Sequence, residues 1–168
     1  MSGIINSAGS KSGVIGPSTF ADTPAFWVYG NGTQSSIGAG YTTCSLNDEI
    51  FDNGSNFDHN TTYTFTAPVT GLYHFDAHLK MEYVLASLAW LNFMLTFTFA
   101  NMTDREPYAT IETSIWDQEA RYFGMHHLSL DTKMDAGDTC VPRVYSPTVG
   151  NVGNIVGTGT YLAGHLIR

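Results

Sequence analysis

The sequence predicts an all-β protein built as an antiparallel sandwich or barrel. Its 168 residues are 43% hydrophobic and 13% aromatic but only 13% charged, with seventeen glycines, ten phenylalanines and nine tyrosines. This composition is typical of short strands joined by tight turns. Roughly ten segments of strand character follow one another at spacings of about 8–12 residues. No alternation of strands with long helices occurs, which excludes a dinucleotide-binding fold.

The strongest alternation lies in residues 61–81, on both sides of a turn. Pro68 removes a ladder donor and Gly71 accepts torsions that other residues avoid, so the chain is expected to turn between them. Beyond the turn, two sets of side chains point in opposite directions: Tyr73, Phe75, Ala77, Leu79 and Met81 on one side, and His74, Asp76, His78 and Lys80 on the other. This pattern predicts a half-buried antiparallel strand with a solvated outer face.

The other elements follow from the same reading. In residues 24–29, a first strand, Ala25, Trp27 and Tyr29 alternate with Phe26 and Val28. Further strands are expected at 41–46, 91–99, 109–116, 122–131, 139–145 and 160–168. Loops are expected at 30–40 and 150–159, and the acidic segment 47–59, with its Asn53-Gly54 turn signal, is expected to be a solvated turn. Residues 83–90 fit either a helical turn or a strand.

Residues 1–23 differ from the rest, since they are rich in Gly and Ser and show no periodicity. Alone they could not bury enough apolar surface to fold. We expect an extended docking arm that orders on a partner, with Ile4, Ile5, Val14 and Ile15 as its docking residues; a disordered tail is the alternative. Residues 24–168 are expected to form one domain.

Charge and hydropathy exclude several functions. The net charge is −8 and only seven residues are Lys or Arg, which argues against nucleic acid because phosphate neutralisation needs clustered cations. The longest apolar run is interrupted by Ser87 and is too short to span a bilayer, so no membrane insertion is expected. No secretory signal is present. Cys44 and Cys140 are expected to be buried free thiols, although a disulfide between them remains open.

No motif for catalysis or a cofactor stands out. His74, Asp76 and His78 could in principle ligate a metal, but outward side chains of one strand lie along a line and no fourth ligand is identifiable. The acidic segment could bind calcium, yet it lacks the spacing of a dedicated calcium loop, so no metal ligand is assigned. A Ser-His-Asp arrangement is not excluded by residue order, but no nucleophile elbow occurs. We therefore predict a protein that is not an enzyme and has no cofactor.

Four pieces of sequence, in order, carry a resemblance. They are Pro24-Ala25-Phe26; the run from Phe51-Asp52-Asn53-Gly54 through Phe57, Tyr63, Phe65, Pro68, Gly71, Tyr73 and Phe75; the segment 128–138 with Gly137-Asp138; and Tyr161 with Gly164 and Leu166. Together they resemble the complement-q-type globular domain of the tumour-necrosis-factor-like (TNF-like) superfamily across residues 24–168. The resemblance implies a ten-strand jelly-roll sandwich that assembles as a homotrimer and does non-enzymatic binding work.

A second resemblance concerns residues 2–16, which are similar to short leader segments of small bacteriophage proteins, notably from marine and cyanobacterial phages. This likeness implies a virion surface component made in the cytoplasm of a host bacterium. Its partners would be other virion proteins, namely the major capsid protein or a tail component, and a glycan or protein of the host surface.

Together these features favour a capsid decoration (cement) knob anchored by its arm. The head domain of a tail fibre is the alternative, and a soluble cytokine-like trimeric binding protein is a third hypothesis. Aromatic surface could be buried between subunits around a three-fold axis. Trp90, Trp116 and Tyr161 are the predicted trimer-interface residues, with internal core as the alternative for each.

Overall fold

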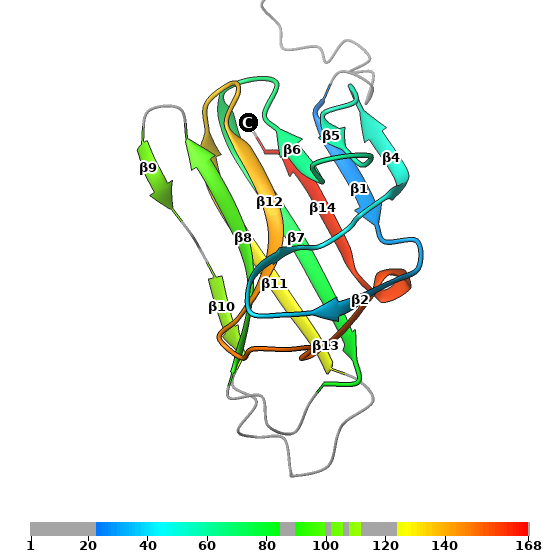
Figure 1. Cartoon of the computed structure of the whole chain (residues 1–168). Coiled ribbons are helices and arrows are strands. Elements are labelled where there is room, and N and C mark those ends of the chain that lie inside the picture. Colours follow the sequence, from blue (N-terminus) through cyan, green and yellow to red (C-terminus); the bar gives the residue numbers. More distant parts are fainter. Residues whose placement is uncertain (1–22, 85–89, 100–101, 106–107, 112–123, 168) are drawn as a thin grey trace, which may run out of the picture.

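The structure, a computed structural model, describes residues 23–84, 90–99, 102–105, 108–111 and 124–167 (Figure 1). These residues form fourteen strands and one 3-10 helix. The strands are β1 (Ala25–Tyr29), β2 (Thr33–Ile37), β3 (Gly40–Thr43), β4 (Asp48–Asn53), β5 (Phe57–Asp58), β6 (Thr64–Thr66), β7 (Gly71–Glu82), β8 (Leu91–Phe99), β9 (Met102–Arg105), β10 (Tyr108–Ile111), β11 (Gly124–Met134), β12 (Thr139–Ser146), β13 (Gly153–Val156) and β14 (Tyr161–Leu166); the helix is η3 (Gly157–Gly159).

The strands make two antiparallel sheets that pack as a sandwich, as the alternating patterns predict. The first sheet has the order β2-β13-β7-β14-β1-β4. β11 lies off this path and pairs with β7. The second sheet has the order β10-β8-β12-β6-β5, with β3 paired to β12 and β9 paired to β8. The twelve-residue strand β7 therefore holds the first sheet together, because it pairs with β11, β14 and β13 at once.

The core lies between the sheets and is built largely from the inward side chains of β7 and β8. The Phe75 ring packs near Phe26, Phe65 and Phe97, with ring centroids 6.3, 5.7 and 5.4 Å away. All four rings are fully buried. Gly164 of β14 faces this cluster, and a Cβ there would come within 2.7 Å of the Phe26 ring. Glycine is thus required at this position by close packing.

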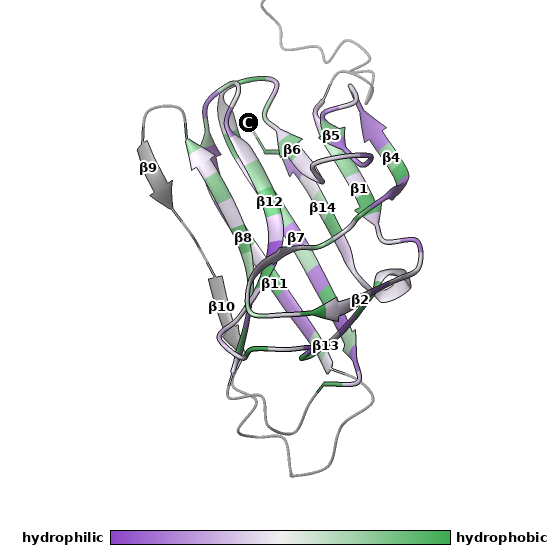
Figure 2. Cartoon of the chain, in the orientation of Figure 1, coloured by the Kyte–Doolittle hydropathy of each residue, from purple (hydrophilic) through white to green (hydrophobic). Residues whose placement is uncertain are grey.

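Alternating hydrophobicity along the strands is the cause of this arrangement. Figure 2 shows hydrophobic and hydrophilic bands alternating along β7 and β11. In β7 every second residue from Tyr73 to Met81 is buried, and the residues between them are only partly covered. One face of the strand is thus core and the other faces out of the sandwich.

Three segments predicted as loops or turns contain strands. β2 lies in 30–40, β13 lies in 150–159, and the two pair with each other near one end of the first sheet. β4 lies in the acidic segment and pairs with β1 through a register shift. The sequence patterns of these strands are weak because β2 and β4 are edge strands with mostly exposed residues, and β13 is only four residues long.

Both cysteines are free and fully buried, which confirms the free-thiol prediction. Burial raises the pKa of the Cys44 thiol from 9.0 to about 12 and raises that of Cys140 well above its usual value. Both thiols are therefore protonated and unreactive at neutral pH. Among the described residues, no helix is long and apolar enough to cross a bilayer.

Candidate functional site

The outer face of the first sheet is the part of the molecule that ordinary β-sandwich architecture does not explain. Side chains opposite one another in the ladders share a face, so the outward residues of β11, β7, β14, β1 and β4 form one surface, which we call the histidine face. Its members include Met125, His127, Ser129 and Asp131 of β11, His74, Asp76 and His78 of β7, Tyr161 and His165 of β14, Trp27 and Tyr29 of β1, and Asp48 and Phe51 of β4.

Large apolar side chains on this face are open to solvent. Trp27 is 40% exposed, Phe51 directly opposite it is 41% exposed, and Met125 at the far edge is 66% exposed. The Trp27 ring contacts Tyr161 at a centroid distance of 5.8 Å, and Tyr161 stacks on His78 at 5.5 Å. An aromatic row therefore crosses four neighbouring strands, from Phe51 on β4 to His78 on β7.

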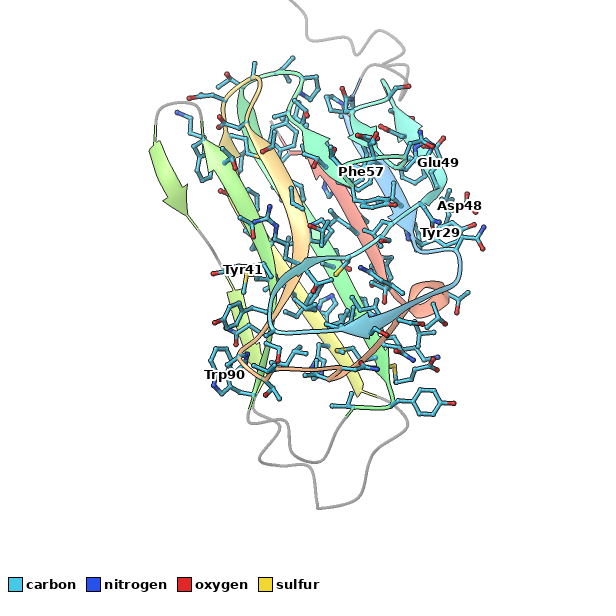
Figure 3. The ribbon with its side chains drawn as sticks, viewed as in Figure 1. Tyr29, Tyr41, Asp48, Glu49, Phe57 and Trp90 are labelled. Atoms are coloured by element: carbon cyan, nitrogen blue, oxygen red, sulfur yellow. The ribbon has the colours of Figure 1, made fainter. Side chains whose placement is uncertain are left out.

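The polar groups of the face are held by one another. Asp76 accepts hydrogen bonds from the Tyr161 hydroxyl at 2.9 Å and from Nε2 of His127 at 2.8 Å. Burial, together with the hydrogen bond and charge of Asp76, raises the pKa of Tyr161. At the edge of the face, the Tyr29 hydroxyl donates to Asp48 at 3.0 Å (Figure 3), and this bond raises the pKa of Tyr29.

The histidines are fixed in defined orientations. Nδ1 of His78 lies 2.6 Å from the carbonyl oxygen of Gly159, and since a carbonyl can only accept, this nitrogen carries a proton. Nδ1 of His74 lies 2.7 Å from Asp131, and the His74 ring contacts that of His165 at 5.3 Å. Four of the six histidines in the chain thus stand on this one face.

One trio has the order of a hydrolase triad, since His74 bonds to Asp131 through Nδ1 and its Nε2 lies 3.5 Å from Oγ of Ser129. The Ser–His distance is at the limit of a hydrogen bond. Acyl transfer also needs N–H donors aimed at the developing oxyanion. The backbone N–H groups of β7 and β11 lie in the plane of the sheet, not on its face. The trio is better suited to holding His74 in place than to catalysis.

The side chains considered for metal binding are engaged in other contacts. His74, Asp76 and His78 each bond to a different partner, and the part of the chain that the structure describes holds no group of three or more His, Cys, Asp or Glu arranged around a metal position. In the acidic segment, Asp52 accepts from the N–H groups of Asn56 and Phe57 and so closes the turn. Calcium remains without an assigned ligand.

The predicted interface residues are distributed differently. Tyr161 lies in the middle of the histidine face, as described. Trp90 lies directly before β8 of the second sheet. Its ring stacks on Tyr145 at 5.3 Å, and Tyr145 contacts Tyr41 at 4.8 Å. Figure 3 shows Trp90 and Tyr41 on the opposite side of the view from Tyr29 and Asp48. Trp116 and the arm residues Ile4, Ile5, Val14 and Ile15 lie outside the described residues.

Sequence reasoning missed Trp27, Phe51, His127 and His165 as members of this surface. Alternation in residues 24–29 grouped Trp27 with Ala25 and Tyr29, but it could not show which set faces out because both sets are apolar. Phe51 lay in a segment read as a turn. The register between β11, β7 and β14, which brings the histidines together, is a property of the fold and leaves no signal within one strand.

Comparison with solved structures identifies the fold. The globular domain of a zebrafish complement 1qA protein matches with a TM-score of 0.60 and 19% identity, covering 86% of this chain and 98% of that one. Eiger TNF from S. frugiperda matches at 0.66 and 11% identity, covering 87% and 93%. Murine APRIL matches at 0.62 and 8%, covering 87% and 100%. These likenesses confirm the predicted jelly-roll sandwich of the complement-q and TNF type.

No model of a protein family matches the chain, and neither does any curated protein.

Proposed function

We propose that the chain is a non-enzymatic binding and structural protein that assembles as a homotrimer through the histidine face. The observation that carries the proposal is the row of exposed aromatic side chains on that face, from Phe51 through Trp27 and Tyr161. The residues that an antiparallel sheet exposes to solvent are normally polar. Aromatic residues and Met are enriched where two proteins meet, and Met125 extends the row's apolar surface at the other edge.

The occupant proposed for this face is a second copy of the same chain. The jelly-roll architecture shared with complement-q and TNF domains supports this choice, and so does the sequence resemblance, which implies a homotrimer. In a three-fold ring, the face of each copy meets a different surface of its neighbour, and the ring closes after three copies. The trimer would leave the outer face of the second sheet available for other contacts.

The proposed cellular role is that of a virion surface component, with capsid decoration favoured over a tail-fibre head. Its support is the sequence of residues 1–23, which is rich in Gly and Ser, carries two apolar pairs and resembles phage leader segments. A segment of that length spans roughly 3.3 Å per residue when extended, which is enough to reach a neighbouring subunit. The apolar pairs Ile4-Ile5 and Val14-Ile15 would dock on a capsid protein.

Two measurements test the homotrimer and the virion role separately. Sedimentation equilibrium of the full chain at pH 7.5 should give three times the 18.3 kDa mass of one chain; a monomer at all concentrations would contradict the trimer. Quantitative mass spectrometry of purified virions should find hundreds of copies per particle for a decoration protein. A few to tens of copies would instead favour the fibre-head alternative, and absence from particles would overturn the virion role.

A further inference from the structure

We propose that assembly through the histidine face is controlled by pH: the trimer is stable near pH 7.5 and weakens as His78 and His165 gain a proton. This inference rests on the proposed function, because it concerns the same surface. Histidine is the side chain that ordinarily changes charge between pH 8 and 5. The face carries four histidines: His74, His78, His127 and His165.

Two of the four histidines already have a counter-ion in their own subunit. Nδ1 of His74 is paired with Asp131 at 2.7 Å, and Nε2 of His127 is paired with Asp76 at 2.8 Å. Protonation of either ring completes an ion pair within the subunit. The charge is then largely compensated before any partner approaches, so these two histidines are expected to change the assembly least.

His78 and His165 differ, since neither forms an ion pair with a described carboxylate. Protonation of His78 would add an N–H at Nε2, because Nδ1 already holds its proton against Gly159. The stacked Tyr161 ring stabilises that cation in the separate subunit. His165 is exposed beside the His74 ring. Burying these uncompensated charges against another subunit carries a desolvation cost that the neutral rings do not have.

The carboxylates of the face are too few to compensate four protonated histidines. The charged groups facing the cluster are Asp76, Lys80 and Glu82 of β7, Asp131 and Lys133 of β11 and Asp48 of β4; β14 and β1 add none apart from His165. Four carboxylates and two ammonium groups give a balance of −2, which becomes +2 when four histidines are protonated. The face of each copy would then present a net positive charge to the neighbouring subunit.

A fifth histidine shows that charge in this region is already unfavourable. His126 stands opposite Leu79, one step along β11, and so points to the other side of the sheet. Burial and the neighbouring His78 charge lower the pKa of His126. His126 is therefore harder to protonate than an unperturbed histidine, and it is not a member of the outer face.

The change in the net charge of the whole chain would instead favour assembly in acid. Protonating four histidines takes the chain from −8 to −4, which reduces long-range repulsion between subunits. Salt screens that repulsion beyond about 8–10 Å at physiological ionic strength. Charges in direct contact at an interface are screened much less. The local cost therefore outweighs the long-range gain, and acid weakens the assembly.

The test is sedimentation velocity of the full chain at pH 7.5, 6.5 and 5.5 in 150 mM salt, over a dilution series. The concentration at which half of the chains are trimeric should be at least tenfold higher at pH 5.5 than at pH 7.5. Near-UV circular dichroism at each pH should show that the subunit stays folded. A double variant, His78→Gln with His165→Gln, should lose most of this pH dependence: whatever its midpoint at pH 7.5, the midpoint at pH 5.5 should differ from it by much less than tenfold.

The matched control is His59→Gln. His59 lies off the face, 3.6 Å from Glu49, and its replacement should leave the pH response unchanged. A wild-type trimer whose midpoint is the same at all three pH values would overturn the switch and leave the proposed trimer standing. A monomer at every pH would overturn both. If the double variant fails to fold, His165→Asn alone should still reduce the response, and an unaltered response in that folded variant would contradict the proposal.

Discussion

The two outer faces of the sandwich have the same backbone architecture but different exposure of their large side chains. On β8 of the second sheet, the outward residues Met94 and Thr96 are 2% and 6% exposed within a single chain. On the histidine face, Trp27, Phe51 and Met125 remain open. The middle of the β8 face is therefore already covered within the chain, whereas the histidine face leaves a tryptophan, a phenylalanine and a methionine open.

In this sandwich the exposed aromatic row, rather than the core, is the feature that points to function. Core positions on both sheets are explained by burial alone. A solvent-facing side chain needs a different explanation when it is a tryptophan with an aromatic neighbour on each side. If the two faces differ as proposed, substitutions on them should change stability and assembly by unequal amounts.

The largest expected effect comes from the shared core beneath both faces. Phe75→Ala removes the ring that packs near Phe26, Phe65 and Phe97, and should lower the free energy of unfolding by about 3–5 kcal/mol. Urea denaturation followed by circular dichroism measures this loss. A change below about 1 kcal/mol would contradict the packing described here.

The next effect distinguishes the two faces. Trp27→Glu places a charge in the aromatic row and should weaken assembly by about 2 kcal/mol or more, roughly thirtyfold in affinity. Tyr41→Glu is the matched control, because Tyr41 is 55% exposed on the outer face of the second sheet. Size-exclusion chromatography with light scattering should show fewer trimers for the first variant only. Equal loss in both variants would remove the proposed distinction.

The buried Cys44 thiol, which follows β3 of the second sheet, should make folding sensitive to alkali. The pKa of Cys44 is raised from 9.0 to about 12 in the folded chain, so its contribution to stability is complete below pH 9 and is lost as the pH rises toward 12. The expected loss is about 1.4 kcal/mol by pH 10 for the Cys44 thiol. Chemical denaturation between pH 8 and 10 measures it, with Cys44→Ala as the control that should show a flatter decline.

The smallest effect concerns a buried hydroxyl of β8. Oγ1 of Thr96 is buried and has no hydrogen-bond partner among the residues that the structure describes. Thr96→Val removes a desolvated polar group and should raise the free energy of unfolding by about 1 kcal/mol. Thermal denaturation measures the change. A destabilised Thr96→Val variant would mean that the hydroxyl is satisfied in solution.

Much of the fold could be predicted from the sequence because strand periodicity is local. The alternation after Gly71 identified the inward residues of β7 correctly, and the free thiols followed from composition. The pattern failed at β2, β4 and β13, where edge exposure or short length weakens the periodic signal. The candidate site was only partly predictable: Tyr161 was named, but the convergence of His74, His127 and His165 depends on cross-strand register.

Hydroxyl-radical footprinting with mass spectrometry tests most directly whether subunits meet through the histidine face. Trp27 and Met125 should be oxidised several-fold more slowly in the assembled protein than after dilution to separate subunits, while oxidation of Tyr41 should stay the same. Unchanged rates at Trp27 and Met125, or protection of Tyr41 alone, would show that the subunits meet elsewhere and would contradict the account.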